Sequence, residues 1–197
     1  LERVGSSRMS KVFVQPPEAA HDIDSAISQT VEAYTSLSKD KVGALMVFER
    51  ANLLDEVIKT GTALDCAVSS ELLKNLFWNK APLHDGAVIV RNGRIVGAGC
   101  MLPLSGNTNL SRDLGMRHRA GIGMSEHSDA VVAIVSEETG SISVAVGGML
   151  KRHLAPETLD RLLRNELKTD EDDGEKKSDL FPLVAALFNR GKKEGTE

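Results

Sequence analysis

Residues 83–102 decide the fold and read LHDGAVIVRNGRIVGAGCML. Two apolar runs in this stretch, Ala87 to Val90 and Arg94 to Leu102, lie on either side of the dipeptide Asn92-Gly93. Asn-Gly between two such runs is the strongest short-range signal for a β-hairpin, because both residues accept the positive φ angles of a type I′ turn. The stretch therefore predicts two antiparallel strands joined by a tight turn.

Other apolar runs extend this hairpin into a sheet. Ala130 to Ser136 and Ile142 to Val146 predict a second hairpin, joined through Thr139-Gly140, and Gly43 to Phe48 predicts a further buried strand. Helical spacing of apolar residues and capping residues predict helices over residues 22–38, 52–59, 69–78, 117–124 and 156–167. Strands mixed with helices in this way indicate an α/β domain with a mixed β-sheet flanked by helices.

The chain has 197 residues, of which 41% are apolar, so it is long enough for one domain with a proper core. We expect that domain over residues 21–167, after an N-terminal extension over residues 1–20. Residues 168–179 are dense in charge and predict a linker, and Leu180 to Phe188 predicts a short amphipathic helix, so residues 168–197 form a tail. The chain starts at Leu1, from which we expect a fragment or a processed form.

The composition argues against several classes of protein. The formal net charge is −4, whereas nucleic-acid coat proteins are usually basic. The apolar runs are too short to predict a membrane span in this chain. The two cysteines, Cys66 and Cys100, form no C-x-x-C pair, so we expect free thiols on buried strands in a reducing compartment.

Four residues are expected to have no part in function. We expect His21, His127 and His153 to be surface or packing residues, because none of them belongs to a polar cluster. Trp78 closes an apolar helix face, from which we predict a core position.

Three clusters of polar, charged or glycine residues interrupt the apolar pattern. The first is Leu83 to Ala87, where Asp85 lies directly before a strand; a carboxylate at a strand entrance needs partners or a metal ion. Gly86 and Ala87 have little or no side chain, so a bulky ligand can approach the backbone closely. An ordinary turn that starts a strand is the alternative interpretation.

The second and third clusters suit phosphate and metal. In Gly115 to Arg119, two arginines flank a histidine at a predicted helix start, where guanidinium and backbone N–H groups bind phosphate oxygens. In Ser136 to Gly140, two carboxylates follow a strand and suit a divalent cation such as Mg²⁺. A solvated charged turn and a plain hairpin turn are the alternatives. Together, the three clusters suit a nucleoside triphosphate and a metal ion, although the chain has no P-loop motif.

Three strings of sequence resemble the diadenylate cyclase domain family, and within it the CdaA type. They are PLHDGAVIV at 82–90, RHRA at 117–120 and VSEETGSISVA at 135–145. The similarity covers about Ile23 to Leu167 and includes GALMVFER at 43–50 and VSSELLKNLF at 68–77. The combination of the DGA and RHR motifs at this spacing is far more specific than either motif alone.

The resemblance implies a fold, an activity and partners. Members of the family are single-domain cyclases that condense two ATP molecules into cyclic di-AMP and release two pyrophosphates. Two protomers placed face to face form the active site, which implies a homodimer or a higher homo-oligomer. The implied cofactor is Mn²⁺ or Mg²⁺, and regulatory proteins are implied partners. The implied location is the cytoplasm, with the parent protein held at the membrane by segments before Leu1.

The resemblance also assigns roles to residues. Four residues would be catalytic: Asp85 would help to activate the 3′-hydroxyl, and Arg117, His118 and Arg119 would lie by the phosphates. His84, Asp85 and Glu138 would hold the metal. The ATP-binding set would be Gly86, Ala87, Met101, Leu102, Met116, Arg117, Ser136 and Glu137.

Two positions depart from the family pattern. Met116 stands where many relatives have Thr, so a hydroxyl near the phosphates is lost. Met101 stands where CdaA-type relatives place a Tyr near the adenine; a Met side chain still covers a purine face, though less rigidly. We nevertheless expect an active enzyme, because the motif residues are intact.

Two other functions remain open. A nucleotide-binding sensor of the same fold would keep the pocket without turnover. A structural interaction module would act through the tail, so deleting residues 168–197 would abolish its function and Asp85→Asn would be silent. The cyclase interpretation predicts the reverse.

Overall fold

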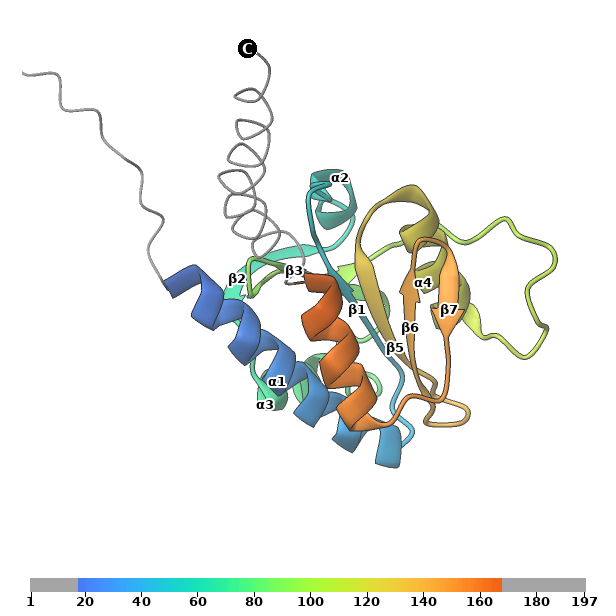
Figure 1. The fold of residues 1–197 in the computed structure, drawn as a ribbon, viewed down its shortest axis with the longest axis horizontal. Coiled ribbons are helices and arrows are strands. Elements are labelled where there is room, and N and C mark those ends of the chain that lie inside the picture. The colour runs from blue at the N-terminus through green and yellow to red at the C-terminus, as the bar shows by residue number, and fades with distance from the viewer. Residues whose placement is uncertain (1–17, 168–197) are drawn as a thin grey trace, which may run out of the picture.

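The computed structural model of the protein describes residues 18–167, with side chains from residue 23 onward (Figure 1). The predicted linker and the predicted helix Leu180 to Phe188 lie outside these residues. The helices are α1 (Glu18–Lys39), α2 (Asp55–Ile58), α3 (Ser70–Phe77), α4 (Met116–His127) and an unlabelled helix over residues 156–167. The strands are β1 (Ala44–Phe48), β2 (Thr62–Ala67), β3 (Ala87–Arg91), β4 (Arg94–Cys100), β5 (Val131–Val135), β6 (Ile142–Val146) and β7 (Met149–Lys151).

All seven strands form one mixed sheet, in the order β2-β4-β3-β1-β5-β6-β7. β1 and β3 run parallel, and every other neighbouring pair is antiparallel. Asn92 and Gly93 join β3 to β4 with φ angles of 49° and 75°, which are those of a type I′ turn. The predicted fold class and the predicted first hairpin are both confirmed.

The sheet buries both of its faces. Along β1, Ala44, Met46 and Phe48 belong to one apolar core cluster, and Leu45 and Val47 belong to a second. This alternation is the two-residue period of a strand. α1, α3 and the helix over 156–167 cover the first face, with α1 and the last helix side by side in Figure 1. α2 and α4 cover the second face.

Local signals explain most helix boundaries. Ser69 caps α3, because its hydroxyl accepts the N–H of Leu72 at 3.2 Å. Pro156 is the first residue of the last helix, as predicted from its missing N–H group. α1, by contrast, begins at Glu18, four residues before the predicted start. Strands β2 and β7 are additional to the prediction.

Trp78 is 58% exposed, so its predicted core position is wrong. α3 ends at Phe77, which is 1% exposed and fills the core in place of the tryptophan. Trp78 is the C-cap residue, and its ψ of 134° turns the chain out of the helix. His127 and His153 are exposed, as predicted, whereas the side chain of His21 lies outside the described residues.

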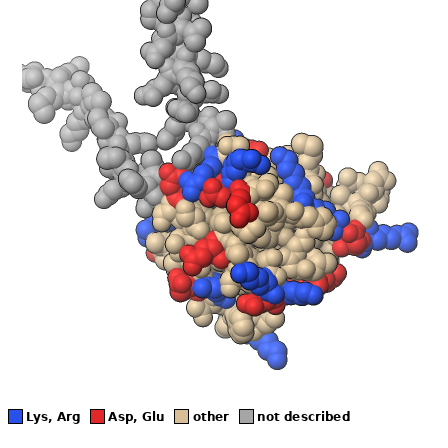
Figure 2. Space-filling model, turned by 60° about the horizontal axis from the view of Figure 1, so that its bottom comes forward, with Lys and Arg blue, Asp and Glu red and all other residues tan. Residues whose placement is uncertain are grey.

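The surface carries both signs of charge. On the face shown in Figure 2, Lys and Arg side chains are intermixed with Asp and Glu side chains and with uncharged surface. Both cysteines are free; Cys100 is buried and Cys66 is half-buried. Between residues 18 and 167, no helix combines the length and the hydropathy needed to cross a membrane.

Candidate active site

Three segments that are far apart in the sequence meet at one edge of the sheet. Met46 of β1 pairs with Val88 of parallel β3, and Ala44 pairs with Val135 of antiparallel β5. The starts of β1 and β3 and the end of β5 therefore lie side by side, in strands about 5 Å apart. Asp85 precedes β3 and Ser136 follows β5 at this edge. The sheet thus brings the first and third polar clusters together.

His84 and Asp85 present adjacent donor groups at the entrance to β3. The Asp85 side chain is exposed, and no described residue holds its carboxylate in a hydrogen bond or ion pair. The half-buried His84 ring places Nδ1 2.6 Å from the carbonyl oxygen of Ala81. A proton on Nδ1 makes this contact a hydrogen bond and leaves the Nε2 lone pair available to a ligand.

The close contact between β3 and β4 requires small residues at 86 and 87. Gly86 has a φ of +116°, and a Cβ there would lie 2.6 Å from the carbonyl carbon of Gly99. Only glycine fits such a position. Ala87 is fully buried in the second core cluster. Packing explains both small residues, and contact of either with a nucleotide stays a prediction.

The start of α4 brings the second cluster to the same edge. Gly115 is the N-cap residue and no side chain caps the helix, so the first N–H groups are free to bind an anion. A Cβ on Gly115 would lie 3.7 Å from Oε1 of Glu138, which places that carboxylate beside the helix start. The residues predicted to bind phosphate and metal are therefore neighbours here.

The two arginines of this cluster have different contacts. Arg117 forms an ion pair with Glu137, which lies in the turn after β5. Arg119 donates from Nε to the carbonyl of Leu114 at 3.3 Å and from Nη2 to that of Ser111 at 3.4 Å. Arg119 thus braces the loop before α4, whereas Arg117 bridges α4 and the turn.

His118 points inward between the two arginines. Its side chain is buried, and Nε2 lies 3.4 Å from the Ser143 hydroxyl on β6. Burial lowers the pKa of His118 and the nearby Arg152 charge adds to this, against the opposing charges of Asp113 and Glu138. The imidazole is therefore held in its neutral form, and it packs between α4 and β6.

A charged contact anchors the loop that leads into α4. Asp113 pairs with Arg152 across 2.8 Å and accepts a hydrogen bond from the Ser111 hydroxyl. The hydrogen bond from Ser111 is the largest cause, and the one from Arg152 the second largest, that lower the pKa of Asp113 to about 2. The carboxylate therefore stays ionised at any physiological pH.

The turn after β5 is held by its first residue. The Ser136 carbonyl accepts the N–H of Gly140 at 2.8 Å, and its hydroxyl lies 3.3 Å from the N–H of Thr139. Gly140 has a φ of 74°, a conformation that favours glycine. Glu137 and Glu138 are consequently displayed on the outside of a fixed turn.

The predicted adenine-side residues follow β4 at the same edge, because Cys100 pairs with Ala87. Met101 is 72% exposed, and its N–H donates to the Thr60 hydroxyl at 2.9 Å. Leu102 packs against the second core cluster, and Met116 is 65% exposed at the start of α4. Two large apolar side chains therefore remain uncovered beside the polar groups.

The donor set fits a divalent cation only in part. Among residues 18–167, no three His, Cys, Asp or Glu side chains gather as a ready metal site. His84 and Asp85 are nevertheless adjacent, and Mg²⁺ commonly takes one or two protein carboxylates together with substrate phosphates. Glu138 lies beside the start of α4 and does not form one cluster with His84 and Asp85.

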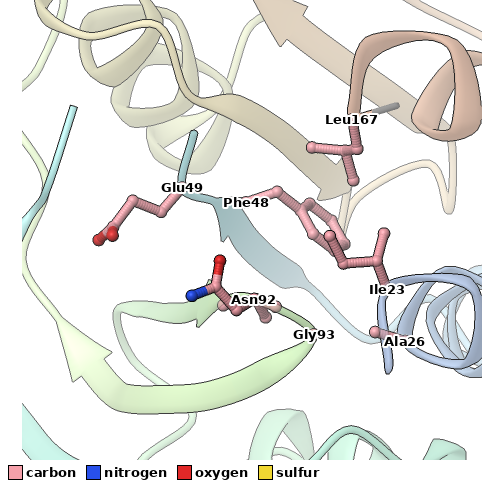
Figure 3. Close-up of a pocket in the computed structure, with 8 residues that line it drawn as sticks. Ile23, Ala26, Phe48, Glu49, Asn92, Gly93 and Leu167 are labelled. Atoms are coloured by element: carbon pink, nitrogen blue, oxygen red, sulfur yellow. The ribbon is translucent and has the colours of Figure 1, made fainter. Parts of the chain in front are cut away.

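A small cavity lies at the opposite edge of the sheet (Figure 3). Its volume is about 20 Å³, which is room for about one water molecule and far too little for a nucleotide. Its lining residues are Ile23, Ala26, Phe48, Glu49, Val90, Asn92, Gly93 and Leu167. The candidate site is therefore the edge that carries Asp85, and this cavity has no part in it.

Sequence reasoning missed two contributors to this edge. Thr60 supports Met101, and Gly43 lies against the guanidinium of Arg117. Neither residue lies in a motif with a recognisable spacing to its partner, so the sequence offered no signal for either contact.

An α/β domain that gathers an arginine, carboxylates and an uncapped helix start at one sheet edge is suited to binding a nucleotide. Comparison with known families agrees: residues 31–150 match the family described as DisA bacterial checkpoint controller nucleotide-binding. The chain belongs to this family, the diadenylate cyclase domain family, as its motifs predicted.

Named relatives and solved structures support the assignment. The chain is 43% identical over 177 residues to the cyclic di-AMP synthase CdaA of Bacillus subtilis, covering 88% of this chain and 63% of that protein. It is 44% identical over 142 residues to a diadenylate cyclase of Listeria monocytogenes, covering 72% and 52%. A crystal structure of a DacA double mutant from Staphylococcus aureus matches with a TM-score of 0.72 at 43% identity, covering 74% of this chain and 97% of that one.

The chain spans less than two thirds of the length of these two curated relatives. Both are named as enzymes that make a cyclic dinucleotide, which places this chain in an enzyme family of the nucleotidyltransferase kind.

Proposed function

We propose that the protein is a diadenylate cyclase that condenses two ATP molecules into cyclic di-AMP and releases two pyrophosphates. One observation carries the proposal: the sheet and α4 bring Asp85, Arg117 and the Ser136–Glu138 turn to a single edge. The family and the names of the relatives supply the reaction.

In this proposal Asp85 assists the nucleophile. Its carboxylate is exposed and without a partner in the described region, so it is available to accept the proton of a ribose 3′-hydroxyl. The 3′-oxygen then forms a bond to the α-phosphorus of the other ATP. The bond between that phosphorus and the oxygen that bridges the α- and β-phosphates breaks. Pyrophosphate leaves with the electron pair of that bond and carries the negative charge.

The groups at the start of α4 bind the phosphates. The free N–H groups and the Arg117 guanidinium offer donors to phosphate oxygens, and Ser136 adds a hydroxyl from the neighbouring turn. Donors fixed before the reaction stabilise the charge that develops as pyrophosphate leaves. Arg119 and buried His118 act as supports, because they hold the preceding loop and the underside of the helix.

A divalent cation, Mn²⁺ or Mg²⁺, would be held by His84 and Asp85; Glu138, which does not gather with them within one chain, would add a ligand only from the facing protomer. When bound, it offsets the negative charge of the triphosphate. Met101 and Leu102 would cover the adenine from the end of β4, and Met116 and Glu137 would border the phosphates.

The reaction needs two copies of the site. Each ATP supplies a 3′-hydroxyl to the other, so two sites must face each other, and residues 18–167 of one chain carry one such edge. We therefore propose a homodimer or higher homo-oligomer with the active site between protomers. Holding both ATP molecules in register replaces a bimolecular encounter, which contributes much of the acceleration.

We further propose that the domain works in the cytoplasm and that its parent protein is anchored in the membrane and meets regulatory proteins there. A matched chain from Bacillus cereus, 46% identical with a TM-score of 0.63, is described as a hypothetical membrane spanning protein, which supports the anchoring.

A product assay tests the function. The purified protein is incubated with ATP and Mn²⁺ or Mg²⁺, and products are separated by chromatography and identified by mass. We expect cyclic di-AMP from the wild type and none from Asp85→Asn. ATP binding without product in the wild type would instead favour the nucleotide sensor, and neither binding nor product would favour the interaction module.

A further inference from the structure

We propose that Gly43 is a positioning residue for Arg117. The absence of a side chain at residue 43 leaves the space in which the Arg117 guanidinium lies, and so determines where that charge is presented. The proposal concerns the same site and rests on the proposed function for its kinetic readout, but not for its structural one.

The contact is specific to one group. A Cβ on Gly43 would lie 2.7 Å from both Cζ and Nη1 of Arg117 and 3.0 Å from its Nε. These three nearest atoms all belong to the guanidinium, and real Cβ atoms essentially never come this close to another heavy atom. An added methyl group therefore meets the arginine head before it meets anything else.

The conformation of Gly43 does not require glycine. Gly86 and Gly140 have φ angles of +116° and +74°, which strain any residue with a side chain, whereas the φ of Gly43 lies outside this left-handed region. Alanine at residue 43 is therefore compatible with the backbone. The space that Arg117 fills is the reason for glycine here.

Arg117, rather than the backbone, would move to relieve a clash. Gly43 directly precedes β1, whose first residue Ala44 is paired with Val135, and the N–H of Val42 donates to the carbonyl of Leu37 at 2.9 Å. The backbone is thus held on both sides of residue 43. The guanidinium is the far end of a side chain with several rotatable bonds, so it shifts at little cost.

The ion pair with Glu137 cannot fix Arg117 alone. The Glu137 side chain is 58% exposed, and exposed ion pairs hold geometry weakly. The Arg117 side chain is only 18% exposed, and its guanidinium lies in the space beside Gly43. The position of the Arg117 guanidinium therefore depends on two features: its ion pair with the Glu137 carboxylate, and the space left by the absent side chain of Gly43.

The experiment compares Gly43→Ala with a matched glycine and with the arginine. Gly106→Ala is the control, because a Cβ there meets nothing within 4 Å. We expect Gly43→Ala to lower kcat/KM for ATP by about tenfold to a hundredfold, since a displacement of about 1 Å has that effect. We expect Gly106→Ala to keep wild-type activity. Tm should fall by no more than about 4 °C in either variant.

Arg117→Ala separates this role from a general packing role. If Gly43 acts through Arg117, Gly43→Ala has no further effect once the guanidinium is gone, so the double variant should match Arg117→Ala within about twofold. If Gly43→Ala proves unstable, the double variant should regain the stability of Arg117→Ala. Additive losses, or a double variant as unstable as Gly43→Ala, would overturn the proposal.

A structural readout keeps the inference separate from the proposed function. The ¹⁵N-NMR signal of the Arg117 Nε–H, identified by its loss in Arg117→Ala, should shift in Gly43→Ala and stay in place in Gly106→Ala. An unmoved signal in Gly43→Ala refutes the positioning role even in an active enzyme. A shifted signal in a protein that makes no cyclic di-AMP supports it and refutes the cyclase proposal alone.

Discussion

The Arg117 guanidinium and the Glu137 carboxylate form an ion pair that joins the first turn of α4 to the turn after β5. The pair links the predicted phosphate-binding helix to the predicted metal-binding turn. Its two ends differ in exposure, at 18% for Arg117 and 58% for Glu137. An ion pair with one largely exposed partner contributes little to stability.

Glu137→Gln should therefore separate stability from activity. We expect the free energy of unfolding to change by less than about 1 kcal/mol, because the carboxylate is largely in water. We expect kcat/KM for ATP to fall about tenfold, because Arg117 loses its charged partner and the turn loses its proposed contact with substrate. Urea unfolding and steady-state kinetics measure the two effects. Glu157→Gln, on an exposed helix start, is the control, and equal losses in both variants would contradict the expectation.

Asp85→Asn tests the proposed base. The amide matches the carboxylate in size but neither accepts the proton nor carries the charge. We expect cyclic di-AMP production to fall at least about a hundredfold, in line with the usual contribution of general base catalysis. ATP affinity, measured by calorimetry, should stay within about threefold, because Arg117 and the helix start are untouched. Near-normal turnover would remove Asp85 from the mechanism.

Thr60→Val tests the support of Met101. The variant removes the hydroxyl that accepts the Met101 N–H at 2.9 Å and that donates to the carbonyl of Val57 at 2.6 Å. We expect a loss of stability of about 1 kcal/mol and a severalfold higher KM for ATP, because the segment after β4 is less fixed. Thr60→Ser keeps the hydroxyl and should restore both values. Failure of serine to restore KM would show that the methyl group matters instead.

His118 makes stability depend on pH. Burial lowers its folded-state pKa below the unfolded value of about 6.5. Between these two pKa values the unfolded chain binds a proton that the folded protein does not. The stability that neutral His118 provides is therefore fully present above about pH 6.5, and it is lost as the pH falls through the folded-state pKa.

We expect the free energy of unfolding to fall as the pH drops below about 6.5, and His118→Gln to flatten that slope. Denaturant titrations at several pH values measure both. Parallel slopes in the wild type and the variant would show that other groups govern the acid response.

Local signals in the sequence predicted the parts of the fold that short-range physics controls. Asn92-Gly93 specified its own turn, and the start of α4 was found within one residue of Met116. β2 escaped prediction because it is a largely exposed edge strand without a clear apolar alternation. Trp78 was misplaced because one residue at a helix end decides between core and solvent.

The candidate site was predictable as a set of motifs but not as an arrangement. The clusters around Asp85, Arg117 and Ser136 stand out because charge interrupts apolar strands, yet their meeting at one edge depends on strand order. Contacts of Gly43 with Arg117 and of Thr60 with Met101 join residues that are distant in sequence. Such contacts depend on the whole fold, so no short stretch of sequence predicts them.

The strand order also shapes how the protein emerges from the ribosome. β1 lies between β3 and β5, so the nascent chain carries β1 with one unpaired edge until residues 131–135 have been made. An unpaired apolar strand invites association with other chains. Synthesis that stops before β5 would therefore leave an aggregation-prone fragment without the Ser136–Glu138 turn, because the strand that covers the open edge of β1 also leads into the last part of the site.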